Sequence, residues 1–95
     1  TTAVTLLTAP TLTAPATDGD GAFGVSWTSV PGAGNYRLQE QVNGGGWNDI
    51  QSGTGLSRAI SGKSAGSYGY RVRACVSSGG SECGPDSTVS TVVVL

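Results

Sequence analysis

Short stretches of this sequence alternate apolar side chains with polar or small ones. The alternation is clear over residues 23–27, 36–39 and 68–74. A period of two places one set of side chains on one face of an extended strand, so each of these stretches is expected to bury one face. No stretch keeps the three-and-four spacing of an amphipathic helix over three turns. The chain is therefore predicted to be built from β-strands.

Clusters of Gly, Pro, Asn and Asp separate these stretches at intervals of about ten residues, a spacing typical of sandwiches and barrels. Turns are expected at 18–21, 43–46 and 61–66, and a loop at 31–35. Strands are expected at 10–15, 23–27, 36–39, 47–51, 56–60, 68–74 and 88–95. Pro at both ends of the first of these places it at a sheet margin. Short antiparallel strands with one buried face each pack as two sheets, so we predict an all-β, two-sheet antiparallel sandwich of about seven strands.

The first nine residues are surplus to that sandwich, which needs only residues 10–95. The segment Thr1–Thr8 has the same Thr- and Val/Leu-rich character as residues 88–94. It is the last strand of a preceding copy in a tandem array, a strand that pairs with the sheet edge of another subunit to give a filament, or a tail that extends the first strand. The residues that such pairing would use are Thr1, Ala3, Val4, Leu6 and Leu7.

The charge and residue inventory excludes several classes of function. The chain has a net charge of −1 and no His, which gives no electrostatic footprint for nucleic acid and leaves a Ser nucleophile without an obvious base. No run of eighteen apolar residues is present, so we expect no membrane insertion. Asp18 and Asp20 form a close pair, which is interpreted as a turn with local hydrogen bonds rather than as a metal site. We therefore predict no enzymatic activity, no metal and no cofactor.

Cys75 and Cys83 are the only cysteines of the chain. A metal site would need His or further Cys ligands, so a disulfide across the end of a hairpin is the favoured interpretation. The alternative is a pair of reduced thiols in a cytosolic protein. A disulfide predicts an oxidising compartment, and hence a secreted or cell-surface location.

Several residues resemble the fibronectin type III family. Trp27 ends the second strand, where the family carries its core Trp, and Tyr36 opens the third, where the family carries a Tyr. The stretch Tyr68–Ala74 is similar to the sixth strand of the family, with Tyr68 at the position of the tyrosine corner. The resemblance implies an immunoglobulin-like sandwich whose core includes Trp27, Tyr36, Tyr68, Tyr70 and Val72.

The Gly-rich turn before Trp47 and the Cys83-Gly84-Pro85 sequence look like the bacterial branch of the family, found in secreted enzymes and large surface proteins. Arg58 departs from the family, which has a small or apolar residue there, and this leaves the register of residues 56–60 open. Lys63 is expected in a loop without a buried acid partner.

Two groups of side chains are candidates for interaction. Trp47 is the one aromatic residue that no inward strand position claims; it either caps the open side of the core or binds a polysaccharide. Arg71 and Arg73 are expected to point outward beside Arg37, with Glu40 and Asp49 available to neutralise them. This group is either a ladder of cross-strand pairs or a partner site.

These features together predict a non-catalytic, extracellular structural or interaction module, a spacer or adhesive unit. Its partners would be another protein or neighbouring copies of itself. The alternatives are the self-assembling filament subunit described above and a carbohydrate-binding accessory domain of a polysaccharide-acting enzyme.

Overall fold

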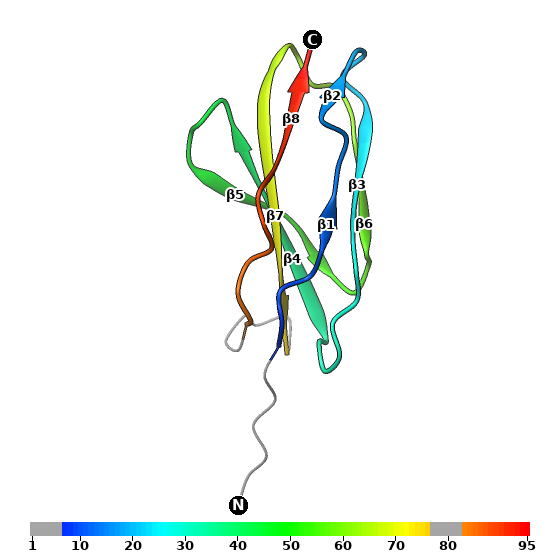
Figure 1. Cartoon of the computed structure of the whole chain (residues 1–95), viewed down its shortest axis with the longest axis vertical. Coiled ribbons are helices and arrows are strands. Elements are labelled where there is room, and N and C mark those ends of the chain that lie inside the picture. The colour runs from blue at the N-terminus through cyan, green and yellow to red at the C-terminus, as the bar shows by residue number, and fades with distance from the viewer. Residues whose placement is uncertain (1–6, 77–82) are drawn as a thin grey trace, which may run out of the picture.

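The computed structural model describes residues 7–76 and 83–95. These residues form strands and turns without a helix (Figure 1), so this part of the chain contains no helix that could cross a membrane. The strands are β1 (Leu12–Thr13), β2 (Thr17–Asp18), β3 (Phe23–Trp27), β4 (Asn35–Val42), β5 (Trp47–Gly53), β6 (Ser57–Ile60), β7 (Gly66–Cys75) and β8 (Ser90–Val94).

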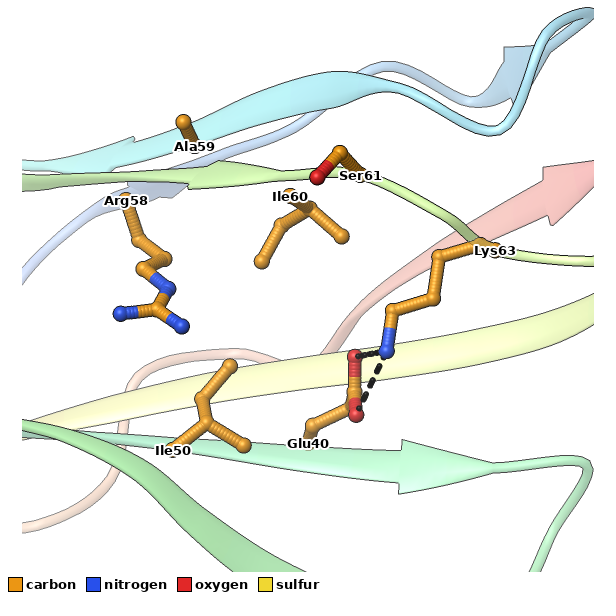
Figure 2. Close-up of a pocket in the computed structure, with 7 residues that line it drawn as sticks. All are labelled: Glu40, Ile50, Arg58, Ala59, Ile60, Ser61 and Lys63. Carbon is orange, nitrogen blue, oxygen red and sulfur yellow. Dashed lines mark hydrogen bonds and ion pairs between the residues drawn. The ribbon is translucent and has the colours of Figure 1, made fainter.

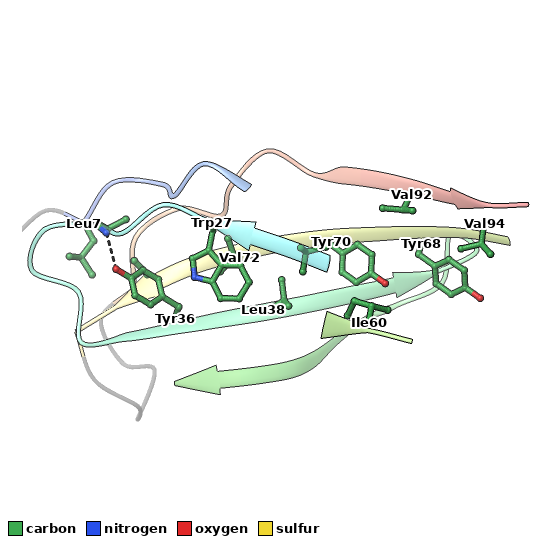
Figure 3. Close-up of a cluster of buried hydrophobic side chains, with 13 residues drawn as sticks. Leu7, Trp27, Tyr36, Leu38, Ile60, Tyr68, Tyr70, Val72, Val92 and Val94 are labelled. Atoms are coloured by element: carbon green, nitrogen blue, oxygen red, sulfur yellow. Dashed lines mark hydrogen bonds between the residues drawn. The ribbon is translucent and has the colours of Figure 1, made fainter. Parts of the chain in front are cut away.

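The strands form two packed sheets, which confirms the predicted sandwich. One sheet has the order β1-β3-β6 and the other the order β2-β8-β7-β4-β5. The core lies between them, where inward side chains of both sheets meet in one row (Figure 3). Its most deeply buried members come from β3, β4, β7 and β8, and include Val25, Leu38, Tyr70, Val72 and Val92. Phe23 and Tyr70 also make an edge-to-face contact across the layers, with ring centroids 5.9 Å apart.

The chain changes sheets before its first long strand. β1 pairs with β3 in the smaller sheet, and β2 pairs with β8 in the larger one. Pro15 lies between them and has no N–H to donate, so a ladder cannot continue through it. The β2–β8 pairing is parallel, and it is the exception among strand pairs that are otherwise antiparallel, as the sequence predicted. Two residues of a sheet-switching segment carry no alternation that would have revealed this pairing.

The turn predicted at residues 43–46 is a tight hairpin that joins β4 to β5. Asn43 and Gly44 both have positive φ angles, 48° and 75°, and Gly45 donates its N–H to the Val42 carbonyl at 2.9 Å. Positive φ at both central residues is the geometry that matches the twist of a two-stranded ribbon and favours Asn-Gly. The hairpin therefore fixes the register of β4 against β5.

The predicted N-terminal segment falls mostly outside the described residues, since Thr1, Ala3, Val4 and Leu6 precede residue 7. Leu7 was predicted to belong to that segment, yet its side chain is 9% exposed and belongs to the core. A Cβ atom on Gly84 would collide with the Leu7 carbonyl, so Leu7 lies against the chain just after the second cysteine. Its side chain is therefore occupied within this molecule.

Candidate interaction surfaces

The residues that the family resemblance assigned to the core are all buried. The Tyr68 hydroxyl donates to the Ser64 carbonyl at 2.7 Å, which is the backbone tie expected of a tyrosine corner. The Tyr36 hydroxyl accepts the Val30 N–H at 2.8 Å. These two hydroxyls fix loops at opposite ends of the core. Because the aromatic rings of this group are buried, none of them is free to contact a ligand.

Cys75 and Cys83 form the predicted disulfide. The two residues also make an antiparallel bridge, and Gly84 donates its N–H to the Ala74 carbonyl at 2.8 Å. Cys75 is fully buried. The crosslink therefore ties the end of β7 to the start of the segment that leads into β8.

Trp47 lies on the outer face of the five-stranded sheet, so it does not cap the open side of the core. It pairs with Gln41 of β4, which in turn pairs with Gly69 of β7. A Cβ atom on Gly69 would lie 3.3 Å from the Trp47 ring. The indole therefore covers the strip of backbone that Gly69 leaves bare. The Arg71 guanidinium stacks on this ring, with its central carbon 4.2 Å from the ring centroid.

A chain of polar contacts continues from Arg71 across the outer face. Arg71 donates from Nε to Gln39 Oε1 at 2.7 Å, and Gln39 donates from Nε2 to Asp49 Oδ1 at 2.8 Å. Asp49 Oδ2 lies 3.7 Å from Arg37 Nη1, and Asp86 Oδ2 lies 3.6 Å from Arg71 Nε. Such exposed pairs contribute a few tenths of a kcal/mol each, about 0.2–1 kcal/mol at most. The contacts order this face and hold Arg71 in place.

Arg73 lies on the same face, directly opposite Arg37. No ion pair to Arg73 is formed by the residues that the structure describes. Glu40, which the sequence offered as a counter-charge for this face, follows Tyr36 and Leu38 in the two-residue alternation and therefore points inward. The outer face thus combines one stacked Trp with three arginines and two aspartates.

Glu40 forms a buried cluster with Lys63 and Tyr70. Its side chain lies 2.9 Å from Lys63 Nζ and accepts a 2.7 Å hydrogen bond from the Tyr70 hydroxyl. Lys63 therefore has the buried acid partner that the sequence did not predict. The lysine comes from the turn after β6, so this cluster connects the two sheets.

Burial of Tyr70 and its hydrogen bond to Glu40 raise the pKa of Tyr70 above its ordinary value. Above about pH 10 the tyrosines of the unfolded chain ionise, while Tyr70 of the folded chain keeps its proton. The unfolded state then binds fewer protons, so stability is expected to fall as the pH rises above about 10. Tyr70→Phe removes this contribution. Urea unfolding at pH 7 and pH 11 should show a smaller alkaline loss in the variant, and equal losses would contradict the assignment.

A cleft opens between β6 and the opposite sheet (Figure 2). It has a volume of about 140 Å³, and its lining is part apolar and part charged: Glu40, Ile50, Arg58, Ala59, Ile60, Ser61 and Lys63. Arg58 pairs with Val25 and Ile60 with Phe23, which settles the register that the sequence left open. Arg58 therefore occupies an inward-facing position, but it remains exposed because β6 is the last strand of its sheet.

The carboxylate pair Asp18 and Asp20 belongs to a turn, as the sequence predicted. The side chains of Asp18 and Asp20 accept backbone hydrogen bonds within their own turn, at 2.6 Å from Gly21 and 3.0 Å from Ala22. Within residues 7–76 and 83–95, no three Cys, Asp or Glu side chains are grouped closely enough to hold a metal ion.

No protein-family model and no curated protein sequence matches this chain. Similar solved structures include a β-1,2-glucanase from Parabacteroides distasonis, with a TM-score of 0.75 at 19% identity. This match covers 97% of this chain but only 13% of the glucanase chain. A Fn3-like protein from Clostridium thermocellum has a TM-score of 0.72 at 23% identity, with 96% of each chain covered. The sixth fibronectin type III domain of a human protein has a TM-score of 0.71 at 26% identity, covering 98% of this chain and 87% of that one.

Proposed function

Because this chain has the fibronectin type III fold, we propose that it is a non-catalytic module that spaces or joins parts of a larger secreted or cell-surface protein. The likeness to 13% of the length of a glucanase supports this proposal. In that glucanase, the same fold makes up a minor part of a much longer enzyme chain. The small Fn3-like structures with which the chain shares nearly its whole length point the same way.

The path of the chain favours a spacer. The described residues begin at one end of the sandwich, and Leu95 lies at the opposite end (Figure 1). Neighbours joined in series to such a module are held apart by the length of the sandwich. The two-sheet core with its tyrosine corner keeps that length fixed, since a packed core transmits strain rather than bending.

The Cys75–Cys83 disulfide supports an extracellular setting, because reducing compartments keep such thiols apart. The test is to purify the protein from its native cells or culture medium in the presence of an alkylating reagent and without reductant. We expect no alkylated cysteine before reduction and two afterwards, by mass spectrometry. Two free thiols in the native material would contradict a secreted or cell-surface role.

Contact with a polysaccharide is the second candidate function, and the position of Trp47 favours it. The half-buried ring lies on a sheet face between Gly69 and the stacked Arg71 guanidinium, and a sugar ring would contact the part of the indole that these two residues leave exposed. Titration with β-1,2-glucan and a panel of other soluble polysaccharides should quench Trp fluorescence in the wild type but not in Trp47→Ala. Absence of quenching across the panel would exclude this role.

A further inference from the structure

The smaller sheet leaves part of the larger sheet uncovered. β3 packs on β7 through Phe23 and Tyr70, and the turn after β6 reaches β4 through Lys63 and Glu40. A further strand of the smaller sheet, placed beside β6 on the side away from β3, would therefore face β5, the last strand of the larger sheet. Among the described residues no strand occupies that position.

The backbone of β6 is ready to pair on this open side. Trp27 donates its N–H to Leu56, and hydrogen-bonded positions alternate along an antiparallel pair, so Arg58 and Ile60 direct their backbone groups toward β3. Ser57 and Ala59 direct theirs outward. Gln51 already donates from Nε2 to the Ser57 carbonyl at 3.2 Å, which shows that this edge accepts a donor. The N–H and carbonyl of Ala59 face the same open side.

Side chains of a strand added beside β6 would enter the cleft shown in Figure 2. Two inward side chains of the added strand, two positions apart, would lie opposite Arg58 and Ile60 of β6. The floor is Ile50, which has no partner of its own on β4, because Gln51 pairs with Leu38 and Asp49 with Gln39. A bulge of this kind re-aims a side chain, and here Ile50 packs partly against the core. One position of an added strand thus meets apolar side chains.

The other position meets an uncompensated positive charge. Lys63 is paired with Glu40, whereas Arg58 forms no ion pair with the residues that the structure describes. An inward-facing charge on an edge strand blocks the addition of apolar strands, which would bury it unpaired. The same Arg58 charge favours a strand that brings a carboxylate, because such a strand pairs the charge whereas an apolar strand leaves it unpaired.

We propose that the open edge of β6 binds an extended peptide segment of a protein partner, which carries an acidic side chain opposite Arg58 and an apolar side chain two positions away opposite Ile60. The segment adds a fourth strand to the smaller sheet through the backbone of Ala59 and of Ser57, whose carbonyl exchanges the Gln51 side-chain amide for a backbone N–H of the segment. The acidic side chain pairs with the Arg58 guanidinium, and the apolar one packs between Ile60 and Ile50.

The test uses seven-residue peptides of alternating Thr and Ser that carry one Glu and, two positions away, one Ile, in both orders. Matched peptides carry Gln in place of Glu. Titration of the isotopically labelled full chain is followed by NMR, with amide exchange as a second readout. We expect one order of the Glu peptide to shift the amides of residues 57–60, to protect Ala59 from exchange, and to bind about 5-fold or more tightly than its Gln counterpart.

Two variants identify the residue that reads the charge. Arg58→Gln should remove the preference for the Glu peptide over the Gln peptide. Arg58→Glu should instead bind a third peptide, with Lys in place of Glu, more tightly than the Glu peptide. Arg58 is exposed, so both variants should give the spectrum of a folded chain. Equal binding of the Glu and Gln peptides, shifts at another sheet edge, no binding of any peptide, or equally tight binding of free N-acetylglutamate would each overturn the proposal.

Discussion

Replacing Trp27 with Ala is expected to lower the free energy of unfolding by about 3–5 kcal/mol. The side chain is 5% exposed and lies in the middle of the row of core residues (Figure 3). Its indole N–H has no hydrogen-bond partner among the described residues, so the ring contributes through apolar contact. Truncation removes those contacts and leaves a cavity. The strands on both sides of the core relax only partly into that cavity, so part of it stays empty. Urea denaturation at neutral pH measures the loss.

Trp47→Ala is the matched control, because it removes the same side chain from the outer face of the larger sheet. Trp47 is half-buried and contacts Gly69 and the Arg71 guanidinium. We expect this variant to lose about 1 kcal/mol or less, which is typical of exposed cross-strand and cation–π contacts. Equal losses in the two variants would contradict the assignment of the two indoles to opposite faces.

Removal of the disulfide has the second-largest expected effect. The bond between Cys75 and Cys83 spans a sequence separation of 8 residues. Closing such a ring in the unfolded chain stabilises the folded state by about 2.5 kcal/mol in the chain-entropy model. For a domain of this size that corresponds to a fall in Tm of about 10–20 °C. Thermal unfolding of the Cys75→Ala/Cys83→Ala double variant should show this fall.

Reductant provides the control for the disulfide. Dithiothreitol should lower the Tm of the wild type by a similar amount and leave the double variant unchanged, because the variant has no bond to break. A wild-type Tm that is insensitive to reductant, with full reduction verified by mass, would show that the crosslink contributes nothing to stability.

The outward and inward positions of β4 show how far sequence patterns reach. Alternation placed Tyr36 and Leu38 inside and Arg37 outside, and the structure agrees. The same alternation, continued by one step, puts Glu40 inside. The interpretation of Glu40 as an available counter-charge for the outer arginines was wrong, because its side chain lies inside against Lys63 and Tyr70. Its partner Lys63 lies 23 residues further along the chain, and no local pattern connects a turn lysine to a buried acid.

Trp47 and Arg58 show a different limit. Neither follows the pattern of its strand: Trp47 is a large aromatic side chain on an outer face, and Arg58 is a charge at an inward position. Both are tolerated because β5 and β6 are the last strands of their sheets, where burial is incomplete and a long side chain reaches solvent. Edge position is a property of sheet order, which a strand's own residues do not encode.

The sequence alone determined the longer strands from β3 onward, the hairpin at Asn43-Gly44, the aromatic core and the pairing of the two cysteines. Each of these rests on near neighbours: the two-residue period, the φ angles that Gly and Asn permit, and a short loop between thiols. Tertiary structure decided the parallel contact of β2 with β8, the Glu40–Lys63–Tyr70 cluster and the cleft beside Arg58. These depend on which strands end at an edge and which face one another across the layers, and that arrangement is set by packing of the whole sandwich.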